Sequence, residues 1–333
     1  MTTARTVPVT TEMDGDELDA GDAWRVARSV GLSRLVVASF VRFRYGDGFT
    51  SSRALALQGA LAVVPFLLAL TGLAADIDSE RPARVIAETI SVVSPGAGEQ
   101  DALASAVTGE QSSEEAGELA LAFGVAFSLL SMTTAMAQVE RGLNRIYGIR
   151  RDRPALAKYA RSAVLTALLA VPLGLGFLLL VAGGAFANAM QGAYGWSDDT
   201  ALLFNIGRWP LGLVLLVFAI AVLLDHSPRR RQPSVSWLAL GSGIAVTITM
   251  VATASLAAYV HLGSFGTVYG PLGGVFALLL WSLLSAMALF FGAAVCAQLE
   301  ACRTGEHEPA YDDPGRPHSK QVASDGPVTG ATT

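Results

Sequence analysis

Residues 272–299 read "LGGVFALLLWSLLSAMALFFGAAVCAQL", a run without a single charged side chain. A helix rises about 1.5 Å per residue, so this run is long enough to cross the roughly 30 Å hydrocarbon core of a bilayer. Apolar runs of this length are typical of transmembrane helices and uncommon in soluble domains. The stretch therefore predicts a membrane-spanning helix.

The chain as a whole is also rich in apolar residues and poor in charged ones. Its 333 residues are 52% hydrophobic and 15% charged, whereas soluble proteins carry about 25% charged residues. We predict an all-α, polytopic membrane protein with six transmembrane helices. The predicted spans cover residues 54–75, 119–137, 163–187, 209–224, 237–260 and 272–299. In the fourth span, Arg208 and Arg229 are expected to snorkel at the two ends, with Pro210 in the first helical turn.

The distribution of positive charge predicts the orientation of these spans. Twenty of the 23 Lys and Arg residues lie in segments 1–53, 138–162, 225–236 and 300–333, which alternate along the chain with the remaining connections. Basic segments stay on the cytoplasmic side of a membrane. Both termini are therefore expected in the cytoplasm. No cleaved signal peptide is expected, because the N-terminus is acidic and the first apolar run starts late.

The terminal segments differ in composition from the middle of the chain. Residues 1–23 are acidic, residues 303–333 are polar with scattered Pro and Gly, and both are predicted to be disordered. Residues 24–302 form the predicted membrane domain. Its first segment, 24–45, reads "WRVARSVGLSRLVVASFVRFRY" and is basic and amphipathic. It predicts either a helix lying in the inner membrane interface or a helix packed on the cytoplasmic end of the bundle.

Three stretches together resemble a known family. They are "DGFTSSRALALQGALAVVPFLLAL" at 47–70, "GLNRIYGIRRDRP" at 142–154 and "GTVYGPLGGVFALLLW" at 266–281. In this order they resemble the YihY/BrkB family of bacterial inner-membrane proteins, sometimes labelled "ribonuclease BN-like". The resemblance covers roughly residues 25–302 and implies six helices with both ends inside. It implies no settled function, since members are discussed as envelope or virulence factors and as transporters, including of lipids. The chain departs from many relatives at Leu57 and Gln58, where they carry an aromatic pair.

A cluster of basic residues follows the second predicted span. Its arginines can bind phosphate through two parallel hydrogen bonds, so the cluster could hold anionic lipid headgroups. The alternative is an anchor that fixes the topology, with the tyrosine at the headgroup level. The candidate headgroup-binding residues are Arg141, Asn144, Arg145, Tyr147, Arg150 and Arg151.

Other polar or irregular positions could border a transport path or act as hinges. Each has a structural alternative: an amide that joins helices, a tolerated kink, hydroxyls bonded to their own backbone, or a tight surface turn. The turn at 261–271 is expected either at the outer surface or dipping into the outer mouth of the bundle. The candidate path or hinge residues are Gln58, Pro65, Thr249, Thr253, Tyr269, Gly270 and Gly273.

Several chemistries are absent from the sequence. No ionisable residue lies in the middle of a predicted span, which disfavours an ion-coupled pump. Glu140, Asp225 and Glu300 are expected to stay hydrated at the cytoplasmic ends. The four histidines are scattered, and no metal-ligand or phosphate-binding motif is present. We therefore expect no enzyme activity, no metal, no cofactor and no nucleic-acid partner.

These observations favour a multi-pass protein of the bacterial inner membrane that handles a lipid or another amphiphilic envelope component. Membrane lipids, with anionic headgroups on the cytoplasmic side, are the expected partners. A non-transporting membrane scaffold and a small-solute channel are the alternatives. Homo-oligomer formation is left open.

Overall fold

The computed structural model describes residues 5–12, 18–75, 114–149, 151–262 and 273–312. Apart from one pair of two-residue strands, the regular structure in these ranges is helical, which confirms the all-α prediction. The elements are β1 (Arg5–Thr6), α1 (Ala20–Val30), α2 (Leu32–Tyr45), α3 (Gly48–Ala75), α6 (Glu114–Ile146), α7 (Ala155–Phe177), the π-helix η2 (Leu178–Ala182), α8 (Gly183–Tyr194), α9 (Asp198–His226), α10 (Val235–Leu262), α12 (Gly273–Arg303) and β2 (Tyr311–Asp312).

Five helical stretches in the described part are long and apolar enough to cross a membrane. They are most of α6, the continuous run of α7, η2 and α8, and then α9, α10 and α12. Helix α3 covers the first predicted run, 54–75, but is not one of these five. A multi-pass membrane protein is therefore supported. The number of six spans and the cytoplasmic position of both termini stay predictions.

Helix α9 differs from its prediction at the N-terminal end. It begins at Asp198, well before the predicted start at residue 209. The hydroxyl of Ser197 accepts a hydrogen bond from the backbone N–H of Thr200 at 3.3 Å and so caps this earlier start. Asp198 and Asp199 in the first turn also favour the positive end of the helix dipole.

Two residue placements change as a result. Pro210 lies inside the helix and not in its first turn, so it cannot donate a hydrogen bond to the preceding turn. Arg208 lies inside a helix that can span the membrane. The structure thus moves Arg208 from the expected end of a span to an interior position of a long apolar helix, and the absence of charge from the middle of the spans stays a prediction.

The six long helices contact one another in a closed order. Each packs on the next, from α3 through α6, α7, α9 and α10 to α12, and α12 returns to α3. The α10–α12 contact is close enough that a Cβ built on Gly241 would lie 2.5 Å from the carbonyl oxygen of Gly292. Ala288, Gly292 and Cys296 repeat every four residues along α12, a spacing of small residues that permits close helix packing of this kind.

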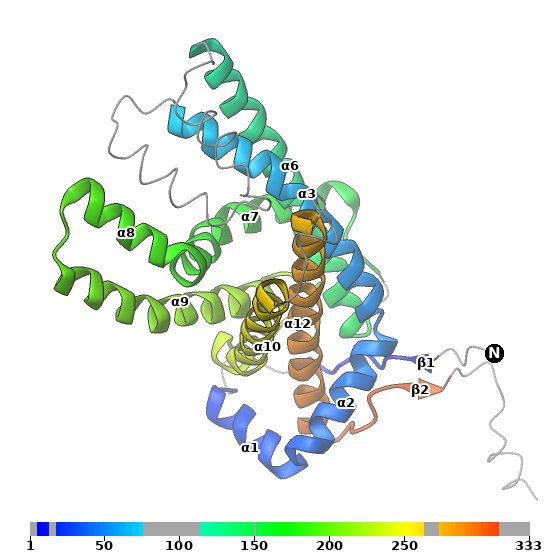
Figure 1. Cartoon of the computed structure of the whole chain (residues 1–333). Coiled ribbons are helices and arrows are strands. Elements are labelled where there is room, and N and C mark those ends of the chain that lie inside the picture. Colours follow the sequence, from blue (N-terminus) through cyan, green and yellow to red (C-terminus); the bar gives the residue numbers. More distant parts are fainter. Residues whose placement is uncertain (1–4, 13–17, 76–113, 150, 263–272, 313–333) are drawn as a thin grey trace, which may run out of the picture.

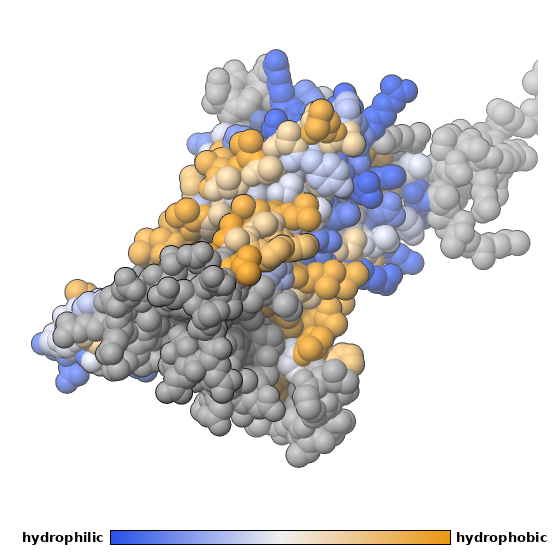
Figure 2. Space-filling view, turned by 90° about the horizontal axis from the view of Figure 1, so that it is seen from above, coloured by the Kyte–Doolittle hydropathy of each residue, from blue (hydrophilic) through white to orange (hydrophobic). Residues whose placement is uncertain are grey.

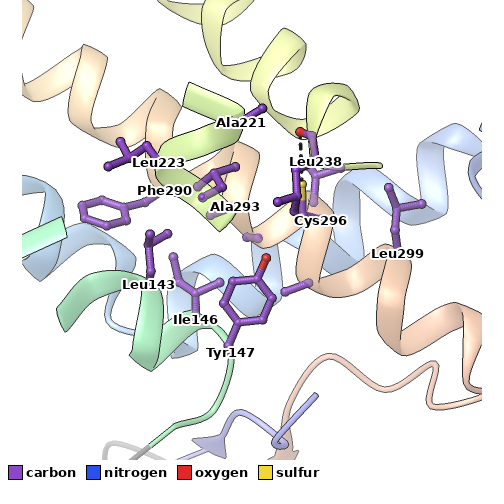
Figure 3. Packing of buried hydrophobic residues seen from close by; sticks show 14 of the residues in the cluster. Leu143, Ile146, Tyr147, Ala221, Leu223, Leu238, Phe290, Ala293, Cys296 and Leu299 are labelled. Carbon is purple, nitrogen blue, oxygen red and sulfur yellow. Dashed lines mark hydrogen bonds between the residues drawn. The ribbon is translucent and has the colours of Figure 1, made fainter. Parts of the chain in front are cut away.

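The hydrophobic core lies at one end of this bundle. We call it the charged end, because it also carries the arginines of the 141–161 and 229–231 segments. It is formed by the C-terminal ends of α6, α9 and α12 and the N-terminal ends of α3, α7 and α10. Figure 3 shows side chains from α6, α9, α10 and α12 meeting there. Buried core residues include Leu143, Ile146, Leu223, Leu238, Phe290, Ala293 and Leu299.

The opposite halves of the same helices expose apolar side chains. Examples, one from each helix in chain order, are Leu61, Phe123, Leu175, Leu203, Val251 and Val275. Helix α8 makes its main contacts with α9 and η2. In Figure 1 the α8–α9 pair points left while α3 and α6 point upward. Figure 2 shows hydrophobic side chains over the middle of the molecule and hydrophilic ones toward the side of β1 and β2.

Helices α1 and α2 lie on the charged end. They meet at Gly31, whose φ of +89° suits glycine. Leu35 and Phe43 of α2 are buried, and α2 contacts α12, whereas Val37 and Phe40 remain exposed. The structure thus shows the packed arrangement that the sequence left open. Contact of the exposed face with the membrane interface stays a prediction.

The two terminal segments pair with each other. Arg5 lies opposite Asp312 and Thr6 opposite Tyr311 in an antiparallel pair. Thr10 also contacts Arg42 of α2, and the carbonyl of His307 accepts from Gln298 of α12, so both segments contact the helices. The disorder expected for the tails stays a prediction. Residues 1–4, 13–17 and 313–333 lie outside the described ranges.

Candidate functional site

The basic cluster after α6 is organised around Asp152. Its carboxylate accepts hydrogen bonds from the amide of Asn144 at 3.1 Å, from Arg141 at 3.4 Å and from Lys158 at 3.4 Å. Partial burial tends to raise the pKa of Asp152, but these hydrogen bonds outweigh burial, so the pKa lies below its usual value. Asp152 is therefore a fixed negative centre within the arginine cluster.

Other members of the cluster hold the end of α9. Arg153 donates to the carbonyls of Ser227 and Pro228, both at 3.0 Å, and pairs with the buried Glu140 at 2.8 Å. Arg161 donates twice to the carbonyl of His226. The last carbonyls of a helix lack partners within it, so these arginines cap α9 and offset its negative dipole end. Glu140 is buried and paired, contrary to its expected hydration.

The structure separates the six candidate headgroup residues into three groups. Asn144 and Tyr147 are fully buried, so their side chains cannot reach a headgroup outside the protein. Arg141, Arg145 and Arg151 are exposed at the charged end. Arg150 lies outside the described residues. Headgroup binding therefore stays a prediction for the three exposed arginines.

A second polar cluster is buried at the charged end. Arg42 of α2 is fully buried and donates from Nε to Gln298 of α12 at 3.1 Å. Its Nη1 donates to the hydroxyl of Thr10 at 2.9 Å and to the carbonyl of Ile146 at 3.2 Å. Burial lowers the pKa of Arg42 to about 10, so the guanidinium remains protonated at neutral pH. One side chain thus ties α2, α6, α12 and the N-terminal segment together.

Arg230 and Glu300 form an ion pair beside this residue. Their side chains are almost completely buried, and Arg230 Nη2 lies 2.7 Å from Glu300 Oε2. The Arg230 guanidinium also lies over the ring of Tyr147, 4.8 Å from the centroid. The same Nη2 donates to the carbonyl of Thr11 at 3.3 Å. Glu300 is therefore not hydrated as expected, because loop and terminal segments cover it.

This network, which we call the buried clamp, comprises Thr10, Arg42, Tyr147, Arg230, Gln298 and Glu300. Its polar atoms are not all paired: Arg42 Nη2, Arg230 Nη1 and Glu300 Oε1 have no hydrogen-bond partner in the described part. Sequence reasoning missed the clamp because its members are far apart in the chain. Charged residues such as Arg230 and Glu300 are visible in the sequence next to apolar runs. The sequence does not indicate which of them contact each other.

The candidate path residues in α3 favour a structural role. The amide of Gln58 donates to the hydroxyl of Thr134 and to the carbonyl of Ser131 on α6. It therefore joins two helices, the role that is common for amides within membranes. Pro65 lies inside the continuous helix α3.

The remaining path candidates lie in α10 and around the turn before α12. The hydroxyl of Thr253 donates to the carbonyl of Thr249 at 2.8 Å and accepts from the indole of Trp281 at 2.9 Å, which links α10 to α12. Gly273 is buried at the start of α12. Tyr269 and Gly270 lie outside the described residues, so the depth of the 261–271 turn stays a prediction.

Within the described ranges, no three His, Cys, Asp or Glu side chains are grouped so as to hold a metal ion. A hydrolytic metal centre needs such ligands together with an open position for water. No catalytic constellation is evident in this part of the chain. The absence of enzyme activity stays a prediction.

Comparison with known proteins agrees with the membrane architecture. The family model described as "Virulence factor BrkB" matches residues 39–316. The chain is 24% identical over 267 residues to the ribonuclease-like protein YfkH of Bacillus subtilis, covering 78% of this chain and 93% of that protein. It is 26% identical to a UPF0761 membrane protein of Chromohalobacter salexigens, covering 80% of this chain and 63% of the relative.

A UPF0761 membrane protein of Pseudomonas aeruginosa is 28% identical over 189 residues, covering 54% of this chain and 42% of that protein. The chain thus spans less than two thirds of the two UPF0761 relatives and nearly all of YfkH. No solved structure matches the chain.

Proposed function

The chain belongs to the BrkB family of membrane proteins, and from this premise we propose that it moves a lipid or another amphiphilic envelope component between the leaflets of the bacterial inner membrane. In this proposal the protein has six spans and its charged end faces the cytoplasm, as the distribution of Lys and Arg predicts. Both termini, which pair at the charged end, are then cytoplasmic.

One observation carries the proposal: among the described residues, the hydrophobic core cluster lies at the charged end. The same six helices expose apolar side chains over their opposite halves, Leu203 and Phe123 among them. Such surfaces are stable against acyl chains, which are as apolar as leucine. A protein that moves an amphiphile must let its acyl chains stay in hydrocarbon while the headgroup follows protein. A bundle closed at one end and bordered by apolar faces at the other suits that requirement.

The exposed arginines at the charged end provide a first contact for the headgroup. Arg141, Arg145 and Arg151 surround a segment that Asp152 holds in place. Each cationic side chain near an anionic membrane surface contributes about 1 kcal/mol. Together they favour a negatively charged headgroup at the cytoplasmic side.

A membrane scaffold is the second candidate, and one observation favours it. Phe123 and Phe127 of α6 are exposed and stack on each other with ring centroids 6.4 Å apart. An aromatic pair of this kind could contact a spanning helix of another protein. A small-solute channel is a weaker candidate, because Leu143, Phe290 and Ala293 fill the centre of the charged end with apolar groups.

Reconstitution into liposomes tests the leading proposal. The vesicles contain a phospholipid with a fluorescent headgroup, and a membrane-impermeant reductant quenches the label in the outer leaflet. Protein that moves lipid should raise the quenched fraction from about one half, the outer-leaflet share, toward completion. Equal quenching in empty and protein-containing vesicles would rule out energy-independent lipid movement. Leakage of a trapped small solute, without lipid movement, would favour the channel.

A variant tests the exposed arginines separately. Replacing Arg141, Arg145 and Arg151 by Gln should reduce the anionic phospholipid that copurifies with the protein, while far-UV circular dichroism stays unchanged. The matched control replaces Arg5, Arg25 and Arg303 by Gln, which removes the same charge elsewhere on the charged side. Equal retention in both triple variants would leave the cluster as a topology anchor only.

A further inference from the structure

Arg208 is a charged side chain in the interior of helix α9. It does not belong to the basic cluster after α6 or to the buried clamp. The helix belongs to those long and apolar enough to span a membrane. Arg208 is 18 positions before His226, which lies at the charged end, and this corresponds to about 27 Å along the helix axis. Arg208 therefore lies in the half of α9 that is remote from the charged end, and in Figure 1 this helix diverges from α3 and α6.

The fold holds this guanidinium in a defined position. Arg208 Nη1 donates to the carbonyl of Leu179 at 3.0 Å. Leu179 belongs to the π-helix η2, in which backbone hydrogen bonds do not follow the α-helical pattern. Single π-helical turns are frequent at functional sites. The irregular turn thus provides an acceptor that orients Arg208.

A glycine makes room for the same side chain. A Cβ built on Gly183 would lie 2.8 Å from Arg208 Cδ and 2.9 Å from Nη1. A Cβ on the neighbouring Gly184 would lie 3.6 Å from Nη2, an ordinary contact distance. The position of Arg208 therefore depends on the absence of a side chain at Gly183.

The charge of Arg208 is not neutralised by the described protein. No Asp or Glu of the described residues lies within ion-pair distance, and the buried Nε has no hydrogen-bond partner there. The guanidinium lies 5.1 Å from the ring centroid of Trp209, which weakly stabilises a cation. Charged side chains at membrane depth are costly, and they usually pair with an opposite charge or mark a binding site.

The surface around Arg208 is apolar. Leu203, Ile206 and Leu211 are 73%, 63% and 53% exposed, and Trp209 is 43% exposed. A ligand that matches these surroundings has a negatively charged group, which pairs with the guanidinium. It also has a hydrocarbon part, which contacts the exposed apolar side chains. Arginine binds phosphate through parallel N–H donors, which makes phosphate the favoured anion.

We propose that Arg208, positioned by Leu179 and Gly183, binds the phosphate group of a membrane phospholipid on the side of the bilayer opposite the charged end. The site deepens the proposed function on which it rests, because it supplies a headgroup contact in the second leaflet. Phosphate can come from a lipid or from solution. The apolar side chains around the guanidinium favour the lipid.

Native mass spectrometry of the full chain in detergent tests the site. The probes are phosphatidylglycerol, phosphatidylcholine, diacylglycerol of the same acyl chains, and inorganic phosphate as a competitor. The parent should bind both phospholipids better than diacylglycerol. Arg208→Gln should weaken phospholipid binding about tenfold, the loss expected for one charge-assisted contact, and Arg208→Lys should weaken it less. Displacement of phosphatidylglycerol by millimolar inorganic phosphate would assign the site to free phosphate and overturn the lipid.

A pair of glycine variants keeps the arginine and changes only its position. Gly183→Ala should reduce phospholipid binding as Arg208→Gln does, because the new methyl group displaces a flexible side chain and leaves the backbone in place. Gly184→Ala is the matched control and should bind like the parent. Unchanged binding in both Arg208→Gln and Gly183→Ala would show that Arg208 only joins α9 to η2.

The binding experiment is independent of transport. Loss of binding in these variants with no lipid movement by the parent would support the Arg208 site and reject the proposed translocation. Lipid movement that is unaffected by Arg208→Gln, together with unchanged binding, would do the reverse.

Discussion

Arg230 and Glu300 pair in an almost water-free environment, and their contribution to stability depends on both being present. Removing one partner of a buried ion pair leaves an uncompensated charge, which typically costs about 3–5 kcal/mol. Replacing both by apolar residues removes that cost. The pair is therefore suited to a double-mutant analysis.

For Arg230→Met and Glu300→Met we expect a large loss of thermal stability for each single variant in detergent. The double variant should recover part of that loss, since neither member of the pair is left without the other, although Arg42 beside them stays buried and charged. The measurement is the melting temperature of all four proteins under one set of conditions. If the losses of the single variants simply add in the double variant, the two side chains are not coupled. The ion pair would then not contribute to the stability of the buried clamp.

Asp152 gives a prediction about pH. Its pKa in the folded protein lies below its usual value of 3.8. A carboxylate with a depressed pKa stabilises the fold above its unfolded pKa, and that stabilisation is lost as the pH falls through the folded value. As the pH falls below about 5 and through the folded pKa, the parent should lose stability more steeply than Asp152→Asn. Parallel melting curves of the two proteins over this range would show that the hydrogen bonds to Asp152 have no effect on stability. Exposure of the carboxylate keeps the expected difference small.

The contact between α10 and α12 tests packing at the scale of elements. A Cβ on Gly241 would meet the Cys296 sulfur at 2.3 Å and the carbonyl of Gly292, whereas a Cβ on Gly243 would have open space. Gly241→Ala should therefore destabilise the protein by about 1–3 kcal/mol through overpacking. Gly243→Ala should be neutral or stabilising, because alanine favours a helix by about 1 kcal/mol. Melting temperatures of the two variants give the comparison, and a Gly241→Ala protein as stable as the control would contradict this packing.

The elements themselves could be predicted from sequence because hydrocarbon imposes one rule. Within a membrane every backbone polar group must bond inside its own segment, so an apolar run of about 20 residues becomes a helix. All six predicted runs are helical where the structure describes them. The boundaries were less predictable. Arg208 was read as the end of a span, although Ser197 and the two aspartates after it already marked an earlier helix start.

The candidate site was less accessible to sequence reasoning than the fold. Asn144 and Tyr147 look like surface residues of a basic loop, but both are fully buried, Asn144 beside Arg229 and Tyr147 beside Arg230. Burial of this kind depends on residues far along the chain, and no local pattern records it. The same applies to Arg42 and Gln298, which are 256 residues apart.

For the whole molecule, the orientation is the first property to establish. A reporter that is active only in the cytoplasm should work when fused after Arg153 and fail when fused after Glu110, because the positive-inside rule places these segments on opposite sides. If the reporter works after Glu110 and fails after Arg153, the predicted orientation is wrong. A fusion at the C-terminal tail should match the one after Arg153, which also tests the even number of spans.

The buried clamp sets an order for biosynthesis. Thr10 and Arg42 are synthesised early, whereas Gln298, Glu300 and the strand at Tyr311–Asp312 are synthesised much later. The N-terminal segment therefore cannot complete its contacts until α12 has been synthesised. Before that point Arg42 lacks Gln298 and Arg230 lacks Glu300, so the buried clamp is incomplete. A chain that stops before residue 273 would lack α12 and would leave Arg42 without its partner Gln298.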